Sequence, residues 1–370
     1  MNVAWLTWKD RDHPEAGGAE VVAHELCQRL LAEGHSVTML TCGYGDAPHR
    51  EQRDGLTTIR VGSSRYAHPF QALLYYLRHM RGKFDVVIEE VNGAPYFSVL
   101  FEHRARRFLL YHQMERIVWF YQTKPPLAQL GYYLLEPVAS RLLSASRTPV
   151  ITVSDSTATD LAQFGFTKPH IISEGIEIKP LASLGRIKKF MRPTLLSLGA
   201  MRAMKRTLDQ IEAFELAKKQ IPSLRLKIAG KADGPYGQQV LARIEASPHK
   251  ADIEYLGHVS RDTKTQLMRR SHIIMQTAVH EGWGLTVTEA ASQGTPAVVY
   301  DVNGLRDSVR HEKTGLITSA QPEALAESIV HLLRRPDQYQ AMRRKAWEWA
   351  RTVTFDKSYQ DFKQIVGASS

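Results

Sequence analysis

Cysteine is nearly absent from this sequence, which contains only Cys27 and Cys42 among its 370 residues. Because Cys27 falls on the apolar face of a predicted helix, no disulfide framework is indicated, and we expect a reducing compartment. Apolar runs that approach the ~18 residues of a membrane span are also absent, and the N-terminus enters a predicted strand without a signal peptide. We therefore expect a cytoplasmic globular protein, not a secreted disulfide scaffold or an integral membrane protein.

Acidic residues are fewer than basic residues, 38 against 48, which gives a formal net charge of +10. Many of the basic residues fall between positions 65 and 124, where aromatic residues are interspersed. The cations are Arg65, Arg78, Arg81, Lys83, Arg104, Arg106, Arg107, Arg116 and Lys124, and the aromatic residues are Tyr66, Phe70, Tyr75, Tyr76, Phe108, Trp119, Phe120 and Tyr121. This mixture suits peripheral binding to an anionic membrane, where each cation contributes about 1 kcal/mol, but it also suits nucleic acid or an ordinary basic protein.

Apolar strands and helices alternate from one end of the chain to the other. The first series has predicted strands at 2–7, 36–41, 85–89 and 150–153, with a helix at 18–33 closed by Gly34 and a helix capped by Ser154. The second has strands at 194–199, 224–229, 253–256, 272–277 and 297–300, with helices at 208–220, after Ser260 and at 285–293. Residues 179–193 between them are polar and aperiodic and are predicted to be a linker. Two such series predict two doubly wound α/β domains with parallel sheets that face a central cleft.

The most informative stretch lies between His280 and Pro296. Glu281 and Glu289 stand on either side of a Gly-X-Gly loop, between an apolar strand and a helix that Gly294 is expected to close in the left-handed conformation. A strand, a glycine loop and a helix N-terminus present backbone N–H groups to a phosphate, and the two carboxylates add acceptors for hydroxyl groups. Together these groups match a sugar attached to a nucleotide diphosphate.

Simpler interpretations remain open for each part of this stretch. Glu289 follows Thr286 by three residues, which is the spacing of a capping box. Glu281 can be a solvated loop residue, and Gly282 and Gly284 can serve only a tight turn. The combination of these residues in this order favours a ligand site.

Two further loops carry groups suited to a diphosphate. Gly17 and Gly18 follow the first strand at the predicted start of a helix, which allows a ligand to approach the backbone. They do not form the Gly-X-Gly-X-X-Gly of dinucleotide-binding proteins, so a hydride-transfer function is not indicated. In the second series, Arg202, Lys205 and Arg206 cluster before a helix that Thr207 is expected to cap, and such cations neutralise the charge of a leaving group.

Two other features bear on catalysis. His112 directly follows the apolar run 108–111, at a strand end where this fold class presents functional groups, although a structural histidine is an equal alternative. Asp10-Arg11-Asp12 matches an Asp-X-Asp pattern that binds divalent metals in some sugar transferases. It falls in a charged loop where chance occurrence is the simpler explanation, so we expect neither a metal nor another cofactor.

The assembled motifs resemble those of glycosyltransferase family four, the retaining group with the GT-B fold, over nearly the whole chain. The stretch 281–296 resembles the Glu-X7-Glu signature of the family, and 17–20 fits its first loop. Tyr111-His112-Gln113 with 119–121 resembles a subgroup that builds bacterial polysaccharides. Residues 174–177, 301–304 and 314–316 also fit, and the aromatic tail 347–362 is similar to C-terminal helices that cross back onto the first domain.

The resemblance implies a role for each candidate residue. The domains would be an acceptor-binding Rossmann-like domain at 1–180, joined by 351–370, and a nucleotide-sugar-binding Rossmann-like domain at 190–350. His112, Glu281 and Lys205 would be catalytic, with His112 near the anomeric carbon. The donor would contact Gly17, Gly18, Arg202, Lys205, Arg206, Glu281, Gly282, Trp283, Gly284, Leu285, Thr286 and Glu289. The family has an arginine after the glycine of the second-domain loop, where this chain has Ala200, and Arg202 or Arg206 would take the place of that arginine. Ser173-Glu174 stands where the family usually has Pro-Asn, and we expect this departure to affect only the hinge.

The sequence thus predicts a metal-independent, retaining glycosyltransferase of the hexosyltransferase type. It would move a sugar from a nucleotide-diphosphate sugar to a hydroxyl of a glycan or lipid-linked acceptor, in bacterial polysaccharide, lipopolysaccharide or glycolipid assembly, with possible peripheral contact with the anionic inner face of the cytoplasmic membrane. A GT-B epimerase that acts on the same donors is the alternative, and a basic nucleic-acid-binding protein is a distant second, so no nucleic acid partner is expected.

Overall fold

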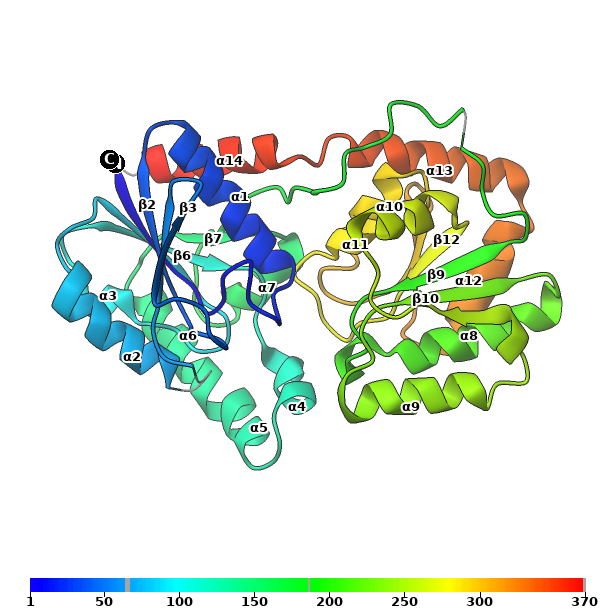
Figure 1. The fold of residues 1–370 in the computed structure, drawn as a ribbon, viewed down its shortest axis with the longest axis horizontal. Helices are drawn as coiled ribbons and strands as arrows, with labels where there is room; N and C mark the ends of the chain where they lie inside the picture. The colour runs from blue at the N-terminus through cyan, green and yellow to red at the C-terminus, as the bar shows by residue number, and fades with distance from the viewer. Residues whose placement is uncertain (64–66, 186, 369–370) are drawn as a thin grey trace. The chain divides into compact units, whose positions relative to one another are not determined.

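The computed structural model describes residues 1–63, 67–185 and 187–368, so Arg65, Tyr66 and one residue of the predicted linker lie outside the described residues. The chain divides into two compact α/β units (Figure 1). Unit 1 comprises Met1–Gly175 and Thr354–Ser370, and unit 2 comprises Ile176–Val353. Within the described ranges, no helix is both long enough and apolar enough to span a membrane.

Unit 1 is built on an eight-stranded sheet with the order β3-β4-β2-β1-β5-β6-β7-β8. Its strands are β1 (Asn2–Leu6), β2 (Ser36–Thr41), β3 (Arg50–Arg53), β4 (Leu56–Arg60), β5 (Val86–Glu90), β6 (Arg106–Tyr111), β7 (Val150–Thr152) and β8 (His170–Ile171). All neighbours are parallel except β3 and β4, which form an antiparallel pair at one edge. The chain moves outward from β1 on one side and from β5 on the other, so the order reverses between these two strands.

Helices cover both faces of this sheet. One face packs against α1 (Gly18–Ala32) and α14 (Phe355–Ala368), and the other against α2 (His68–Tyr75), η1 (Tyr76–Met80), α3 (Ser98–Phe101), α6 (Glu136–Ala145) and α7 (Asp155–Ala162). Short elements join β6 to α6, namely η2 (Arg116–Val118), α4 (Trp119–Gln122), α5 (Leu127–Leu130) and η3 (Gly131–Leu135). Alternate strand residues supply the two cores, because successive side chains of a strand point to opposite faces.

The last helix of the chain belongs to unit 1, as expected for a segment that crosses back. Phe355 and Phe362 are buried in the core formed with α1, the rings of Trp5 and Phe362 lie 5.8 Å apart, and Arg29 pairs with Asp356 at 2.9 Å. The segment of unit 1 begins at Thr354, against the 351 given for the crossing segment. Trp347, at the start of the aromatic tail, lies on α13 in unit 2 and donates a hydrogen bond to the Leu181 carbonyl. Only α14 returns to unit 1.

Unit 2 has a six-stranded sheet, parallel throughout, with the order β11-β10-β9-β12-β13-β14. The strands are β9 (Thr194–Leu198), β10 (Arg225–Ala229), β11 (Ile253–Tyr255), β12 (Ile273–Gln276), β13 (Ala297–Tyr300) and β14 (Gly315–Thr318). The helices are η4 (Ala203–Lys205), α8 (Thr207–Gln220), α9 (Gly234–Glu245), η5 (Lys250–Asp252), α10 (Arg261–Arg270), α11 (Leu285–Ser292), α12 (Pro322–Leu333) and α13 (Pro336–Ala350). Two apolar cores on opposite faces show that this sheet is also doubly wound.

The predicted elements of both series are present, with ends that shift by one or two residues. Ser154 and Ser260 cap α7 and α10 as helix N-caps, and Gly34 and Gly294 have φ values of 82° and 72° in the left-handed region that glycine favours.

The linker prediction was wrong for much of 179–193, because this segment packs onto unit 2. The Lys189 ammonium donates hydrogen bonds to the carbonyls of Ser271 and Gly294 and to the Thr295 hydroxyl. Burial, together with the nearby Arg343, holds the pKa of Lys189 well below its ordinary value. The polar composition of 179–193 therefore does not indicate a free linker, because Lys189 of this segment donates hydrogen bonds to buried carbonyl groups of unit 2.

Candidate active site

The donor-site candidates of unit 2 gather at the carboxyl ends of β9 and β12. Strand order reverses between these neighbours, since β10 and β11 extend on one side and β13 and β14 on the other. In open parallel sheets the crevice at such a reversal is where ligands bind. The loop after β9 carries Lys205, and the loop after β12 carries Glu281, so the topology brings both loops to one edge of the sheet.

Hydrogen bonds fix these two loops to each other. The Thr277 hydroxyl donates to the carbonyl of Lys205 at 2.8 Å, and the Val279 N–H donates to the carbonyl of Met204 at 2.8 Å. The Lys205 ammonium forms an ion pair with the Glu281 carboxylate, and both side chains are partly exposed. A cation suited to a phosphate and a carboxylate suited to hydroxyl groups therefore share one small region.

The N-terminus of α11 opens at the same place. Its N-cap is Gly284, whose φ of 97° lies in the left-handed region, and a Cβ there would lie 2.9 Å from the Leu305 side chain. No side chain of the described residues caps this helix, so the leading N–H groups of Leu285 and Thr286 are the ones a phosphate would meet. The capping-box alternative is wrong, because Thr286 lies inside the helix and its hydroxyl accepts a hydrogen bond from Gln276.

Glu289 is nearly buried on α11, where it pairs with the Lys264 ammonium at 2.6 Å. Burial raises the pKa of Glu289, and the adjacent Lys264 charge opposes that rise. A buried carboxylate with one cationic partner retains acceptor capacity for another donor, such as a ribose hydroxyl. Lys264 was not among the predicted residues, because only its pairing with the distant Glu289 identifies it.

The cations of the predicted cluster have different partners in the structure. Arg206 has a φ of 50°, pairs with Asp209 at 2.6 Å, donates to the Ala320 carbonyl and lies over the Tyr300 ring. Arg202 is exposed. The prediction that Thr207 caps α8 was wrong, because the helix begins at Thr207 and its N-cap is Arg206.

The two remaining residues of the glycine loop differ in their surroundings. Trp283 donates from its indole N–H to the Thr288 hydroxyl at 2.9 Å, and its ring lies 6.2 Å from that of Trp349. Trp283 therefore anchors the loop against α13. Gly282 is partly exposed between Glu281 and Trp283.

In unit 1 the glycine pair lies at the start of α1, as predicted. Gly17 is the N-cap and Gly18 the first helical residue. The Gly17 N–H donates to the Glu20 carboxylate at 2.5 Å, and Glu20 also pairs with Lys9 at 3.2 Å. The loop before α1 is thus tied to the first turn of the helix by a buried carboxylate.

His112 lies at the carboxyl end of β6 and is buried. Its Nε2 is 3.7 Å from the Glu90 carboxylate, which also accepts hydrogen bonds from the Trp5 indole and the Thr7 hydroxyl. Burial disfavours the charged imidazole, but the adjacent Glu90 and the charges of Glu174 and Glu20 outweigh it, so the pKa of His112 lies above its ordinary value. Glu90 therefore joins the ends of β1 and β5 to His112 and favours its protonated form.

Glu174 is buried close enough to His112 for the two charges to interact. Burial raises the pKa of Glu174 to about 7, against the opposing effects of His112 and the Gly175 N–H. The expectation that the departure at Ser173-Glu174 affects only the hinge was therefore wrong. Ser173 donates to Asp361 of α14, while Glu174 adds a carboxylate to the surroundings of His112.

Glu174 makes the stability of the protein depend on pH. Because its folded pKa of about 7 lies above the ordinary 4.5, its contribution is fully present below pH 4.5 and is lost as the pH rises through about 7. We expect wild type to lose on the order of 3 kcal/mol relative to Glu174→Gln over this window, at ~1.4 kcal/mol per pKa unit. Urea unfolding at several pH values measures this difference. The exposed Glu348→Gln is the control and should follow wild type, and a constant difference between wild type and Glu174→Gln would contradict the assignment.

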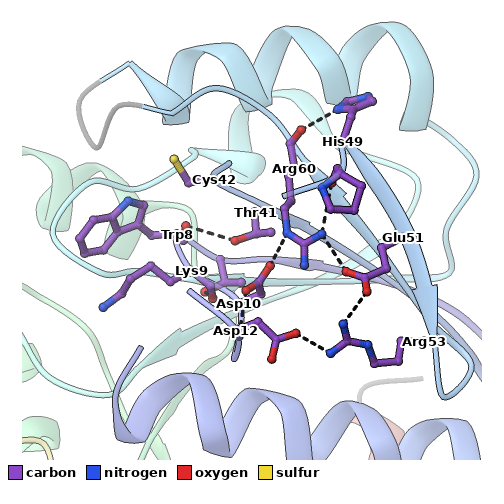
Figure 2. Close-up of polar contacts among 12 residues, drawn as sticks. Trp8, Lys9, Asp10, Asp12, Thr41, Cys42, His49, Glu51, Arg53 and Arg60 are labelled. Atoms are coloured by element: carbon purple, nitrogen blue, oxygen red, sulfur yellow. Dashed lines mark hydrogen bonds and ion pairs between the residues drawn. The ribbon is translucent and has the colours of Figure 1, made fainter. Parts of the chain in front are cut away.

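The Asp-X-Asp pair is occupied by arginines (Figure 2). Asp10 accepts a hydrogen bond from the buried Arg60 at 2.7 Å, and Asp12 accepts one from Arg53 at 2.7 Å. Glu51 lies between the two arginines and binds both, at 2.9 Å and 2.7 Å. The two aspartates therefore serve to tie the first loop to the β3–β4 hairpin, and each already has a cationic partner.

Comparison with known proteins decides the family. The profile described as Glycosyltransferase Family 4 matches residues 16–179, and the profile described as Glycosyl transferases group 1 matches residues 186–349. The chain belongs to glycosyltransferase family four. It is a transferase that uses a nucleotide-sugar donor.

Relatives and solved structures agree with this assignment. The GDP-mannose-dependent alpha-(1-6)-phosphatidylinositol dimannoside mannosyltransferase of Mycobacterium tuberculosis is 24% identical over 378 residues, which cover 96% of this chain and 93% of that protein. Sucrose-phosphate synthase from Thermosynechococcus elongatus has a TM-score of 0.82 at 19% identity, and HepE of Anabaena in complex with UDP-glucose has a TM-score of 0.75 at 14% identity. Both structural matches cover 100% of each chain and establish the GT-B fold of this glycosyltransferase.

Glu90 and Lys264 of this glycosyltransferase were not among the predicted residues, and Glu174 was named only for the hinge. Glu90 ends the apolar strand β5, and an acidic residue at the end of a buried strand was the signal that could have identified it. Lys264 and Glu174 become relevant only through partners distant in sequence, Glu289 and His112. The candidates Lys205, Glu281 and the α11 N-terminus lie together in unit 2, whereas Gly17, Gly18 and His112 belong to unit 1.

Proposed function

We propose that this glycosyltransferase moves a sugar from a nucleoside diphosphate to a hydroxyl acceptor with retention of the anomeric configuration. The observation that carries the proposal is the Lys205–Glu281 pair beside the uncapped N-terminus of α11. In the donor complex, Lys205 and the leading N–H groups of α11 bind the diphosphate, Glu281 accepts hydrogen bonds from the sugar hydroxyls, and Glu289 accepts them from the ribose. The Lys205 ammonium thus exchanges Glu281 for phosphate as the donor binds.

The proposed reaction is a front-face displacement. The bond from the anomeric carbon to the diphosphate oxygen breaks, and the acceptor oxygen forms a bond to the same face of that carbon. The departing phosphate oxygen takes the proton of the acceptor hydroxyl, so no separate carboxylate base is needed. Cations and helix N–H groups fixed in advance stabilise the negative charge that develops on the leaving group.

His112 is assigned to the surroundings of the anomeric carbon. Glu90 raises the pKa of the His112 imidazole, and a ring N–H of His112 can donate a hydrogen bond to a donor oxygen. We propose that the reaction requires no metal, since Asp10 and Asp12 are held by Arg60 and Arg53.

The acceptor is proposed to be a glycan or a lipid-linked sugar in bacterial polysaccharide or glycolipid assembly. The phosphatidylinositol-linked substrate in the name of the mycobacterial relative supports the lipid alternative. UDP-glucose in the HepE structure supports a UDP-sugar as the first donor to test. A GT-B epimerase acting on the same donors would convert them without any acceptor, which separates the two reactions.

Thermal unfolding with a panel of UDP-, GDP- and ADP-sugars tests the donor assignment. A ligand at 100 times its Kd stabilises the folded state by about 2.7 kcal/mol, so one donor class should raise the melting temperature by several degrees. The rise should persist with a chelator present and should shrink in Glu289→Ala, which removes the proposed ribose acceptor. If no nucleotide sugar produced a rise, or if the rise required a divalent metal, the corresponding part of the proposal would be overturned.

A further inference from the structure

An exposed apolar ridge runs from the last residue of α5 along η3 and α6 in unit 1. Its members are Leu130, Tyr133, Leu134, Leu135, Val138 and Leu142, and each has an exposed side chain. Tyr133 is 71% exposed, Leu142 56% and Leu134 52%. Large exposed apolar side chains concentrated in one short segment of a folded protein often mark a surface that binds something.

The ridge is a fixed part of the fold. A Cβ at Gly131 would lie 2.3 Å from the Trp119 ring, so η3 packs directly on that ring. The buried Glu136 accepts hydrogen bonds from the N–H groups of Glu115 and Arg116 and from the Trp119 indole. The outward side chains are therefore presented by an anchored helix.

A second apolar stripe lies on helices that cover the same face of the unit 1 sheet. Phe70, Leu74 and Leu77 are exposed along α2 and η1 at helical spacing. The inward residue Tyr76 of η1 and Leu143 of α6 belong to cores on the same face of the unit 1 sheet, opposite α1 and α14. Both helices therefore turn their outer sides away from one sheet face, as their position in Figure 1 also shows.

Positive charge without negative charge accompanies these apolar groups. Between Arg116 and Arg147 the single acidic residue is Glu136, which is buried, whereas Lys124, Arg141 and Arg147 are exposed. Residues 68–83 contain no acidic residue at all and three cations at their C-terminal end.

We propose that this surface, the ridge together with the α2 stripe, docks on an anionic phospholipid bilayer. Apolar side chains that enter the interface and lysine or arginine side chains that reach the headgroups are the two requirements for such binding. A second copy of the chain fits less well, because a two-fold interface places the same patch against itself and would set cation against cation. Among the described residues, neither 68–83 nor 116–147 carries an exposed carboxylate that could relieve that repulsion.

The position of this surface connects it with the chemistry of unit 1. Residues 113–142 directly follow His112 in the chain, so the docking surface and the proposed catalytic histidine belong to the same folded unit. Where the proposed function holds, docking would bring lipid-linked acceptors to the histidine. Docking itself needs no donor, so its test is independent of the transfer reaction.

The region of mixed cations and aromatic residues seen in the sequence contributes only in part. Tyr76, Phe108 and Trp119 are buried in the cores, whereas Phe70, Phe120 and Tyr121 are exposed. All six residues of the exposed ridge lie beyond residue 124, outside the mixed region that the sequence analysis identified.

Co-sedimentation with vesicles tests the proposal. The full chain should bind vesicles of phosphatidylcholine with phosphatidylglycerol, bind vesicles of phosphatidylcholine alone much less, and dissociate as salt is raised. Leu134→Gln with Leu142→Gln should weaken binding about tenfold or more, because two apolar anchors are lost. Arg141→Gln with Arg147→Gln should weaken it by a similar factor, at about 1 kcal/mol for each cation.

Two matched controls lie in unit 2. Met191→Gln removes a fully exposed apolar side chain, and Arg344→Gln with Lys345→Gln removes two exposed cations of α13; both variants should bind as wild type. All variants should keep the melting temperature and the donor-induced stabilisation. Absence of vesicle binding at low salt would overturn the proposal, as would equal binding by the ridge variants, or a dimer in light scattering that the ridge variants abolish.

Discussion

Lys205→Ala is expected to lower the turnover of this glycosyltransferase about 10²–10³-fold on its true donor. The Lys205 ammonium contacts Glu281 in the free protein and is assigned to the diphosphate in the donor complex. Negative charge on that group grows as the glycosidic bond breaks, so losing the cation should lower kcat more than it weakens donor binding. Steady-state kinetics with separate measurement of donor affinity resolves the two effects.

Lys345→Ala is the matched control, since it removes an exposed lysine from α13 in the same unit. Glu281→Gln provides a second arm, because it keeps the shape of the side chain but removes the charge that pairs with Lys205. It should also lower turnover strongly while the melting temperature stays close to wild type. Wild-type rates in both Lys205→Ala and Glu281→Gln would show that the donor site lies elsewhere.

Arg60→Met is expected to destabilise unit 1 by about 3 kcal/mol. The Arg60 side chain is 3% exposed and binds Asp10 and Glu51, so its removal leaves the buried Asp10 carboxylate without its cation (Figure 2). For a protein of this size the melting temperature should fall by roughly 10 °C, since each kcal/mol corresponds to about 2–4 °C. Differential scanning calorimetry or urea unfolding measures the loss.

Arg53→Ala tests whether burial is the cause. Arg53 belongs to the same network, but its side chain is 61% exposed, and exposed ion pairs contribute at most about 1 kcal/mol. We therefore expect little change in this variant. If Arg53→Ala and Arg60→Met lowered the free energy of unfolding equally, burial of Arg60 would not explain the destabilisation.

The loop that Arg60 holds leads to Gly17 and Gly18, which are donor-site candidates. Asp10 lies in the segment between β1 and Gly17, and the Trp8 carbonyl of that segment accepts hydrogen bonds from Thr41 and Cys42. A variant that loosens the β3–β4 hairpin should therefore also disturb the glycine pair at the start of α1.

Periodicity and turn chemistry predicted most of the fold from the sequence. The alternation of strands and helices gave two doubly wound units, and Ser154, Ser260, Gly34 and Gly294 act at helix ends as expected. These features are local, because a cap or a left-handed glycine is decided by the residues beside it. The Glu281–Gly294 stretch was readable for the same reason, since its strand, loop and helix are consecutive.

Features that depend on distant partners were not predictable in this way. Glu90 and Glu174 are identified as site residues by their proximity to His112, and Lys264 by its pairing with Glu289. These partners are distant in sequence, and only the order of the strands in the sheet brings them together. The capping role given to Thr207 failed because Arg206 adopts a left-handed conformation beside Asp209. The exposed ridge escaped notice because apolar spacing indicates which side of a helix is apolar but not whether anything covers it.

The return of α14 to unit 1 has a practical consequence for dissecting this enzyme. A fragment that ends at Gly175 would lack Phe355, Tyr359 and Phe362, which fill the core between α1 and the sheet. Such a fragment would expose the apolar surface of α1 and the sheet and would aggregate. A peptide with the sequence of α14, added separately, should restore its solubility. C-terminal truncations, or bulky fusion tags at the C-terminus, should therefore destabilise unit 1 more than unit 2, although unit 2 directly precedes α14 in the sequence.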